Sequence, residues 1–354
     1  MVATLAAYLH DIDPYAIRIW EGRLVRWYGL SYLAGFLVAY LIIKRIAQLG
    51  NSPLKVKQAG DLVMALAVGV VVGGRLGYVV FYQPSLLVTF TGELPYWQLL
   101  AINQGGMASH GGLIGLVVAS LWYARRNKIL WRHVIDLAAF ALPIGLFFGR
   151  VANFVNGELY GRRCADDFAL AVKFPQEMQS WDRGRLDQLS SVVDRVGIRS
   201  DEWQAALSSF TRSSSERISY AVSQLIERVQ AGDAVIADAL APLITARHPS
   251  QLYQASLEGL FLFVVLAWAW SRPRKPGVIF ALGGVVYSLV RIVAEQFRQP
   301  DVHIANLEFA QLGITRGQWL SAILLVVSLA AMLICARSNA APLGGWKRKL
   351  EPQR

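Results

Sequence analysis

Long apolar segments recur along this 354-residue chain, and they limit its possible folds more than any other feature. Seven stretches approach the 17–25 residues that a helix needs to cross a bilayer. They lie at residues 27–43, 61–82, 96–124, 133–155, 251–270, 277–297 and 317–336, and the third is broken in its middle. Only 17% of the residues are charged, against about 25% in average soluble chains. We therefore expect an all-α, polytopic bundle of about seven transmembrane helices.

The basic residues lie mostly in alternate connections between these segments. The connections at 44–60, 125–132 and 271–276 and the tail at 338–354 are rich in lysine and arginine, whereas 83–95 contains neither. Cytoplasmic loops carry an excess of lysine and arginine. The pattern therefore places the N-terminus outside the cell and the C-terminus in the cytoplasm, and an odd number of spans agrees with that.

The formal net charge of +11 would suggest a nucleic-acid partner if this were a soluble domain. Here the basic residues flank apolar segments, where they set the topology and contact anionic lipid headgroups. We therefore expect the lipid bilayer, and no nucleic acid, among the partners. The two cysteines, Cys164 and Cys335, show no spacing typical of a metal site.

One segment, residues 162–247, does not have the composition of a membrane span. It contains eleven lysines and arginines against twelve aspartates and glutamates. Within it, the stretch 216–230 carries apolar residues at helical spacing. We expect a small, largely helical head domain outside the cytoplasm. The remaining boundaries are then 1–161 for four membrane helices, 248–337 for three more and 338–354 for a basic cytoplasmic tail.

The helix predicted at 133–155 runs into a polar sequence. That sequence is Gly149-Arg150-Val151-Ala152-Asn153-Phe154-Val155-Asn156-Gly157-Glu158-Leu159-Tyr160-Gly161. Arg150, Asn153, Asn156 and Glu158 are thereby placed at or near bilayer depth, where an isolated charge costs about 2.5 kcal/mol or more. Such side chains persist only when they have partners, and they mark a functional site by default. Asn156-Gly157 favours a turn, so we expect the helix to open there.

A second group of polar side chains follows one face of the segment at 277–297. Tyr287, Arg291, Glu295 and Arg298 are spaced by four, four and three residues, which places them within roughly an 80° stripe of a helix. An internal ion pair would explain why these charges are tolerated. It would not explain two arginines for one glutamate, and an excess guanidinium facing a cavity suits a phosphate ligand.

Three further runs combine polar residues with glycine, proline or aromatic residues. His110 lies in a glycine-rich stretch that is tolerated at bilayer depth only around a cavity, although a lone histidine is more often structural. Arg75 stands between glycines, and Tyr28 belongs to an aromatic pair that could simply lie in the interfacial belt. The run His-Pro-Ser-Gln-Leu-Tyr at 248–253 suits a helix start, and a role for it in function is left open.

Small residues also recur every fourth position in two of the apolar segments. They are Gly69, Gly73 and Gly77 in the second segment and Gly111 and Gly115 in the third. Small residues at this spacing let membrane helices approach closely. We interpret these glycines as packing residues.

The polar runs resemble sequence blocks of a known family, the bacterial prolipoprotein diacylglyceryl transferases. Residues 149–161 match the signature G-R-x-x-N-F-x-N-x-E-x-x-G at every fixed position, and residues 287–301 match Y-x-x-x-R-x-x-x-E-x-x-R-x-P-D. The runs H-G-G-L and H-P-S-Q-L-Y are similar to further blocks. Matching blocks cover 26–161 and 248–320. Residues 162–247 are longer than the head region expected of the family, so no role is carried over to them.

The resemblance implies an integral enzyme of the bacterial cytoplasmic membrane. It would transfer a diacylglyceryl group from phosphatidylglycerol to the thiol of the lipobox cysteine of a prolipoprotein, release glycerol phosphate and use no metal or organic cofactor. The residue types suit that chemistry. A thiolate is the nucleophile, and negative charge develops on a leaving phosphate, which fixed cations in a low-dielectric site stabilise.

The resemblance also implies roles for individual residues. Arg150 and Arg291 would stabilise the developing charge, with Glu158 and Glu295 orienting the arginines and His110 acting as the general base for the thiol. The expected catalytic residues are His110, Arg150, Arg291, Glu158 and Tyr28. The expected phosphatidylglycerol-binding residues are Arg150, Arg75, Asn153, Tyr287, Glu295, Arg298 and Gly161.

Two other classes of protein fit parts of the pattern. Charges inside the membrane and broken helices also mark the paths of transporters and channels, although the two halves of the chain show no inverted repeat. A lipid-binding scaffold without catalysis is a third interpretation, and replacement of His110 or Arg150 should leave such a scaffold functional.

Overall fold

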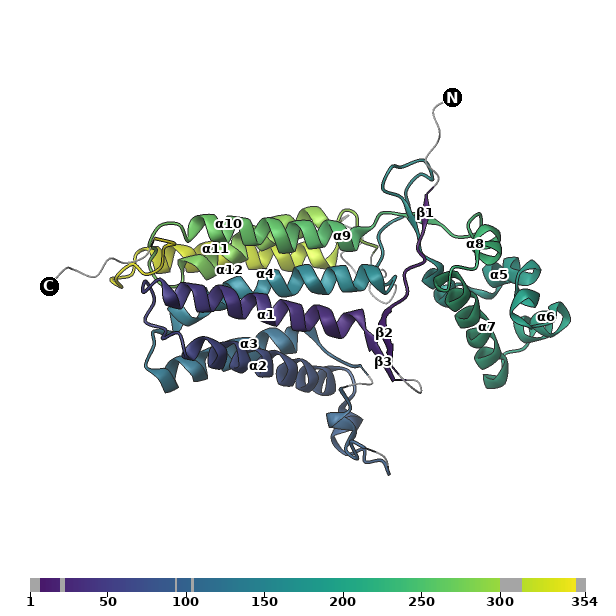
Figure 1. Cartoon of the computed structure of the whole chain (residues 1–354), viewed down its shortest axis with the longest axis horizontal. Helices are drawn as coiled ribbons and strands as arrows, with labels where there is room; N and C mark the ends of the chain where they lie inside the picture. Colours follow the sequence, from purple (N-terminus) through teal and green to yellow (C-terminus); the bar gives the residue numbers. More distant parts are fainter. Residues whose placement is uncertain (1–6, 20–22, 93, 103–104, 300–313, 348–354) are drawn as a thin grey trace. The chain divides into compact units, whose positions relative to one another are not determined.

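The computed structural model describes residues 7–19, 23–92, 94–102, 105–299 and 314–347. Within these residues the chain is mostly helical (Figure 1). It divides into two compact units. Unit 1 contains Met1–Tyr32, Phe147–Leu257 and Arg291–Trp319, and unit 2 contains Leu33–Leu146, Glu258–Val290 and Leu320–Arg354.

In the part of the chain that the structure describes, five helical stretches are long and apolar enough to cross a membrane, so the prediction of a polytopic membrane protein is confirmed. They are α1 (Trp27–Gln48), α2 (Gln58–Phe81), α4 (Trp131–Val155), the stretch Ser250–Ala269 and Gly317–Ala336 within α12 (Arg316–Ala336). The stretch Ser250–Ala269 consists of α9 (Ser250–Gln254), a π-helical turn (Ala255–Phe261) and α10 (Leu262–Ala269). A shorter apolar helix, α11, covers Val278–Ala294.

The third predicted span differs from the expectation. Its helix, α3, covers only Ser109–Asn127, and the described residues from 96 to 108 form a loop with a short 3-10 turn, η2 (Gln98–Leu100). Gly105 and Gly106 have φ angles of 87° and 78°, which a helix does not allow. A second 3-10 turn, η1 (Pro84–Leu87), precedes this loop.

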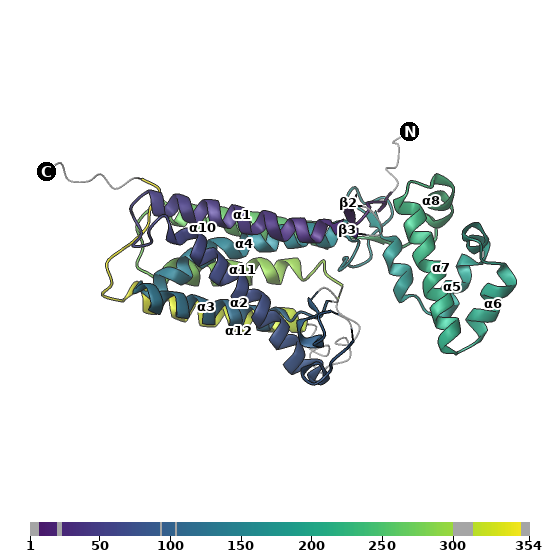
Figure 2. The ribbon, with the colours of Figure 1, turned by 60° about the horizontal axis from the view of Figure 1, so that its bottom comes forward.

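In unit 2, α2 and α3 lie side by side in both orientations of the ribbon (Figures 1 and 2). Their glycines make the contact. A Cβ atom added to Gly73 would lie 2.4 Å from the carbonyl oxygen of Gly111, and one added to Gly115 would lie 1.9 Å from that of Gly69. Only bare backbone fits at these distances, so the predicted packing role of the glycines is confirmed.

The core of unit 2 is mostly apolar, and one of its buried polar side chains caps the start of a helix. Ile43, Leu62, Phe140 and Trp270 are among the fully buried side chains. Asp136 of α4 accepts hydrogen bonds from the backbone N–H groups of Gly277, at 2.7 Å, and Phe280, at 2.8 Å. A side chain from another helix thus satisfies N–H groups that α11 leaves unpaired at its start.

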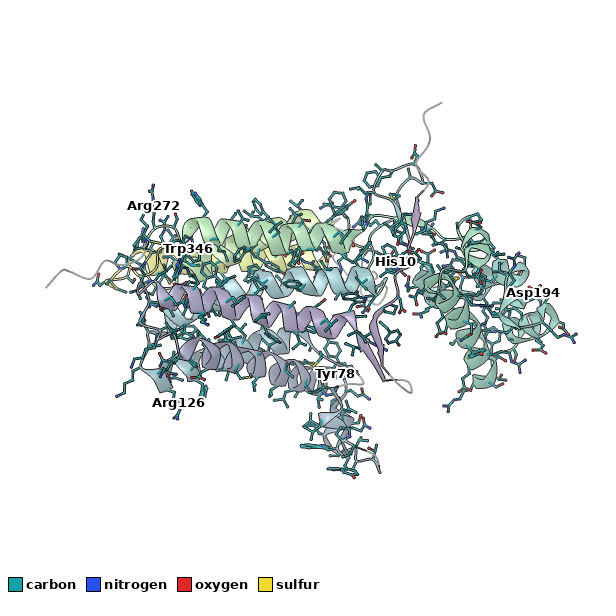
Figure 3. All side chains as sticks on the ribbon, in the orientation of Figure 1. His10, Tyr78, Arg126, Asp194, Arg272 and Trp346 are labelled. Carbon is teal, nitrogen blue, oxygen red and sulfur yellow. The ribbon has the colours of Figure 1, made fainter. Side chains whose placement is uncertain are left out.

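The two ends of unit 2 differ in charge. Figure 3 places Arg126, Arg272 and Trp346 toward one end of the unit and Tyr78 toward the other. The loop that follows Tyr78, at 83–95, contains no lysine or arginine. The labelled basic residues therefore lie at one end of the unit, whereas Arg75, one turn before Tyr78 in α2, is buried.

In unit 1 the segment that was expected to form a head is largely helical and has its own core. Ile218, Val222, Leu225, Ile226 and Val229 of α7 are buried, which confirms the predicted periodicity. The elements are η4 (Pro175–Ser180), α5 (Arg183–Leu186), η5 (Asp187–Ser191), η6 (Val193–Val196), α6 (Ser200–Ser208), α7 (Arg212–Gln230) and α8 (Ala234–Leu240) (Figure 1).

Two small β-sheets in unit 1 were not predicted. Strand β4 (Val172–Lys173) pairs in parallel with β1 (Tyr8–Leu9) and antiparallel with β5 (Ala246–Arg247). Strands β2 (Tyr15–Ile19) and β3 (Arg23–Arg26) form an antiparallel pair. The sheet of β1, β4 and β5 brings the N-terminal segment and both ends of the head segment together. The fold is therefore mostly helical rather than purely so.

Candidate active site

The motif helix α4 ends where the sequence predicted that it would open. Its last residue is Val155, and Gly157 adopts a φ of 66° in the turn that follows. The N–H of Gly157 donates to the carbonyl of Phe154 at 2.9 Å, and the N–H of Glu158 donates to that of Asn153 at 3.0 Å. These bonds close the helix end and turn the chain away from the helix axis.

The turn holds the Glu158 carboxylate beside two other predicted site residues. Asn153 donates from Nδ2 to Oε1 of Glu158 at 2.7 Å and to the hydroxyl oxygen of Tyr28 at 3.4 Å. Asn153 is buried, whereas Glu158 is exposed. Tyr28, Asn153 and Glu158 therefore form one polar group, and Arg150 lies one helical turn before Asn153 on α4.

A buried carboxylate stands at the centre of the second polar group. Glu295 is 3% exposed, and its carboxylate oxygens lie 3.0 Å from Nη2 of Arg291 and 3.8 Å from Nη1 of Arg298. The Thr315 hydroxyl donates to the same carboxylate at 3.3 Å. Two guanidinium groups thus share one carboxylate, as the residue spacing had indicated. Pro300 and Asp301, the end of the sequence block, lie outside the described residues.

Gly161 joins the two polar groups through the backbone of unit 1. It forms an antiparallel bridge with Arg298, and its N–H donates to the carbonyl of His248 at 3.0 Å. A Cβ atom at this position would lie 2.5 Å from the His248 oxygen and 2.6 Å from the Phe297 oxygen. Glycine is required here because any other residue would push these segments apart.

Arg75, in unit 2, uses its guanidinium within the protein. It donates to the carbonyl oxygens of Gln98, Leu99, Gly105 and Gly106 at distances from 2.6 to 3.0 Å, and it is buried. These four bonds hold the loop that precedes α3. The arginine thereby fixes the loop that leads into the His110 helix.

Two further predicted residues also belong to unit 2. His110 lies exposed in the first turn of α3, and its side chain makes no hydrogen bond with any residue that the structure describes. Tyr287 of α11 packs against the hydrophobic core of the unit. The remaining predicted site residues all lie in unit 1.

The sequence analysis missed several residues that support these groups. Gln251 is fully buried and donates from Nε2 to the backbone carbonyl of Glu158 at 2.7 Å. Gln251 belongs to the run at 248–253, for which the sequence analysis predicted no contact. Gly317 leaves room for the Glu295 carboxylate, because a Cβ atom there would lie 2.8 Å from Oε1. No signal in the sequence pointed to Gly317 or to Thr315.

The fold and these polar groups define a multi-pass membrane protein with an arginine–carboxylate cluster around Glu295 at the end of α11 and a second polar group at the end of α4. Comparison with known proteins gives the family. The model of the family described as prolipoprotein diacylglyceryl transferase matches residues 14–334. The chain therefore belongs to that family and is a transferase, which decides against the transporter and scaffold interpretations.

Several curated relatives match over nearly their whole length. The phosphatidylglycerol–prolipoprotein diacylglyceryl transferase of Bdellovibrio bacteriovorus is 46% identical over 345 residues, covering 96% of this chain and 97% of the relative. Those of Chromobacterium violaceum and Phenylobacterium zucineum are each 35% identical, over 329 and 330 residues, and cover 92% and 90% of this chain. A chain of this length therefore occurs in the family.

Proposed function

We propose that the chain transfers a diacylglyceryl group from phosphatidylglycerol to the thiol of the lipobox cysteine of a prolipoprotein. This is the first step of bacterial lipoprotein maturation. A sulfur–carbon bond forms at the terminal glyceryl carbon, and the bond between that carbon and the phosphate oxygen breaks. The thiol loses its proton to a base, and glycerol phosphate leaves with the electron pair of the broken bond. The proposal requires no cofactor.

The observation that supports this proposal best is the arrangement of two arginines around the buried Glu295. One buried carboxylate pairs with both Arg291 and Arg298, which holds two guanidinium groups in fixed positions near the end of α11. A phosphodiester that becomes a phosphate monoester gains negative charge as the bond breaks. A fixed guanidinium in a low-dielectric site stabilises that charge without reorganising.

We assign stabilisation of the leaving phosphate to Arg150 and Arg291, and binding of the headgroup to Arg298, Tyr287 and Asn153. Glu295 orients the arginines next to it. The contact between Asn153 and Glu158 supports a role for this pair in orienting the site beside Tyr28. Gly161 contributes by holding the surrounding segments close.

We assign the general base to His110. Its side chain is exposed in the first turn of α3, and a thiolate is the attacking form of cysteine, so the thiol needs a base. Arg75 supports this assignment indirectly, since it holds the loop that leads into α3. Replacement of His110 by glutamine should abolish transfer while leaving the protein folded.

The proposal includes a site open to the outer half of the bilayer. Arg150, Glu158, Arg291 and Glu295 would line its polar cavity, because charges on several membrane helices need shared partners. The protein would lie in the bacterial cytoplasmic membrane with about seven spans, its N-terminus and the 162–247 head outside and its C-terminus in the cytoplasm. Protease added to the cytoplasmic side of oriented vesicles should therefore leave the head uncut; cleavage there would reverse the orientation.

A direct assay tests the activity. The purified full-length chain is mixed with phosphatidylglycerol in detergent micelles and a peptide that carries a lipobox cysteine. We expect a peptide that has gained the mass of a diacylglyceryl group, with release of glycerol phosphate in equal amount. Replacement of the cysteine by serine in the peptide is the control and should yield no product. Failure of the cysteine peptide to react would refute the proposed function.

A further inference from the structure

Arg247, the last residue of β5, is a buried arginine to which the mechanism above gives no role. Its side chain is enclosed, with only 5% of the residue exposed. Nε donates to the Glu177 carboxylate at 2.7 Å, while Nη1 donates to the carbonyl of Gly161 at 3.3 Å and to the side-chain oxygen of Gln299. One side chain therefore joins three segments that lie far apart in the sequence.

The Glu177 carboxylate, which pairs with Arg247, has several further hydrogen-bond partners. Glu177 is 1% exposed and lies 2.6 Å from Nη2 of Arg185 and 2.7 Å from Nε of Arg247. It also accepts hydrogen bonds from the N–H of Thr245, at 3.0 Å, and from the indole N–H of Trp181, at 3.3 Å. Such complete bonding offsets the cost of burying the charges. It also fixes the orientation of both arginines.

The backbone segments that this guanidinium joins also pair directly with one another. The N–H of Gly161 donates to the carbonyl of His248, and the N–H of His248 donates to that of Arg162, each at 3.0 Å. The N–H of Arg162 donates to the carbonyl of Phe297 at 2.8 Å, and Gly161 forms a bridge with Arg298. A shift in any of these segments would therefore move Arg298.

We propose that Arg247 is a positioning residue for the diacylglyceryl transfer proposed above, on which this inference rests. Its guanidinium is already engaged by the Glu177 carboxylate, Gly161 and Gln299, so it is not assigned a contact with the substrate. It acts through Gly161 and Gln299. Gly161 forms a backbone bridge with Arg298, and Gln299 is the next residue after Arg298 in the sequence. The head segment thereby sets where the Arg298 guanidinium meets the Glu295 carboxylate.

An arginine suits this position because its acceptors lie in different directions. The guanidinium presents donors in a rigid planar fork, whereas the ammonium of lysine is a compact point charge. A lysine would keep a charge opposite Glu177 but would not reach Gly161 and Gln299 at once. Displacement of a site by about 1 Å can cost up to about 100-fold in rate. Replacement of Arg247 by lysine should therefore lower the turnover rate more than it lowers the stability of the fold.

The test compares two lysine variants of the full-length protein. For wild type, Arg247→Lys and Arg185→Lys, kcat and KM are measured with phosphatidylglycerol micelles and a lipobox peptide, and the unfolding temperature is measured alongside. We expect Arg247→Lys to lower kcat about tenfold or more, with KM for the peptide close to that of wild type. Arg185→Lys is the matched control: Arg185 pairs with the same carboxylate but otherwise donates only within the head segment, to Leu243 and Thr245. It should keep the wild-type kcat.

A second variant keeps the inference testable if Arg247→Lys does not fold. Gln299→Ala removes one acceptor and leaves the pair of Glu177 and Arg247 intact, so it should lower kcat without lowering the unfolding temperature. The inference is overturned if Gln299→Ala and the folded Arg247→Lys turn over like wild type. It is also overturned if Arg247→Lys and Arg185→Lys lose kcat and unfolding temperature equally, since that would mark a purely stabilising network. A wild-type chain that transfers no diacylglyceryl group would instead refute the proposed function.

Discussion

The guanidinium of Arg291 lies 3.0 Å from the carboxylate of Glu295, one helical turn further along the chain, and both side chains are largely buried. Buried pairs of this kind contribute little net stability, because desolvation costs about as much as the attraction returns. A second arginine, Arg298, shares the same carboxylate at 3.8 Å. We therefore interpret the cluster of Arg291, Glu295 and Arg298 as a fixed cation site rather than as a stabilising ion pair.

The first prediction separates these two roles of Arg291. Lysine would keep the ion pair with Glu295 but would lose the planar fork that binds two phosphate oxygens at once. If Arg291 holds the phosphate through the transition state, Arg291→Lys should lower the rate of transfer by about tenfold to a thousandfold. Initial rates at matched amounts of folded protein measure the effect.

The control for this measurement is Arg212→Lys. Arg212 forms an exposed pair with Glu216 at 2.9 Å in the head, with the same four-residue spacing, and exposed pairs contribute little. This variant should transfer at the wild-type rate. Equal rates for wild type and Arg291→Lys would assign Arg291 to structure and leave Arg150 as the phosphate-stabilising residue.

Local sequence signals predicted the parts of this protein that depend on local chemistry. The helix opening at Asn156-Gly157, the buried face of α7 and the ion pair between Arg291 and Glu295 follow from turn preference and helical spacing alone. The approach of α2 and α3 followed from the spacing of glycines. In each case the residues that decide the structure lie within about two turns of one another or repeat at a fixed period.

Contacts between distant segments could not be predicted in the same way. Pairing of Tyr8–Leu9 with residues 172–173 joins two-residue strands that carry no recognisable period. The third span was expected to begin at 96, because apolar composition does not show that Gly105 and Gly106 adopt positive φ angles. Arg75 was expected to face a headgroup, and its use of four carbonyl groups depends on how the loop folds back.

The second prediction concerns the contact between α2 and α3. A methyl group on Gly73 would lie 2.4 Å from the carbonyl oxygen of Gly111 and 2.7 Å from Cα of Gly115, and backbone atoms cannot give way as side chains do. Gly73→Ala should destabilise the protein by about 1–3 kcal/mol, the usual cost of overpacking. Thermal unfolding in detergent measures it. Gly145→Ala in α4, where a Cβ atom meets nothing within 4 Å, should unfold no earlier than wild type.

The third prediction concerns the loop that Arg75 holds. Lysine cannot donate to four carbonyl groups spread over residues 98–106, so Arg75→Lys should loosen this loop. We expect faster hydrogen exchange of its backbone amides and a lower rate of transfer. Arg126→Lys, an exposed residue at the end of α3, should change neither. Wild-type exchange in Arg75→Lys would show that the loop is held by other contacts.

The fourth prediction concerns the pH dependence that Glu177 gives to folding. Burial alone would raise the pKa of this carboxyl group, but the Thr245 N–H and the guanidinium groups of Arg247 and Arg185 together bring the pKa below its ordinary value. Because the pKa is lower in the folded state than in the unfolded state, the carboxylate stabilises the fold above the unfolded pKa of about 4.3. That stabilisation is lost as the pH falls through the lower, folded pKa.

Glu177→Gln should therefore change both the free energy of unfolding at neutral pH and the way in which it depends on pH. Near pH 7 the variant should be less stable by about 3–5 kcal/mol, because two buried arginines lose their carboxylate partner. As the pH falls below about 4.3, the wild type should lose stability faster than the variant, so that the difference between them narrows. Unfolding temperatures measured in detergent from pH 7 to pH 3 test this, with Glu216→Gln, an exposed glutamate of α7, as the control that should follow the wild type. Parallel curves for wild type and Glu177→Gln would mean that Glu177 titrates alike in the folded and unfolded states, which its buried pairs with Arg185 and Arg247 do not allow.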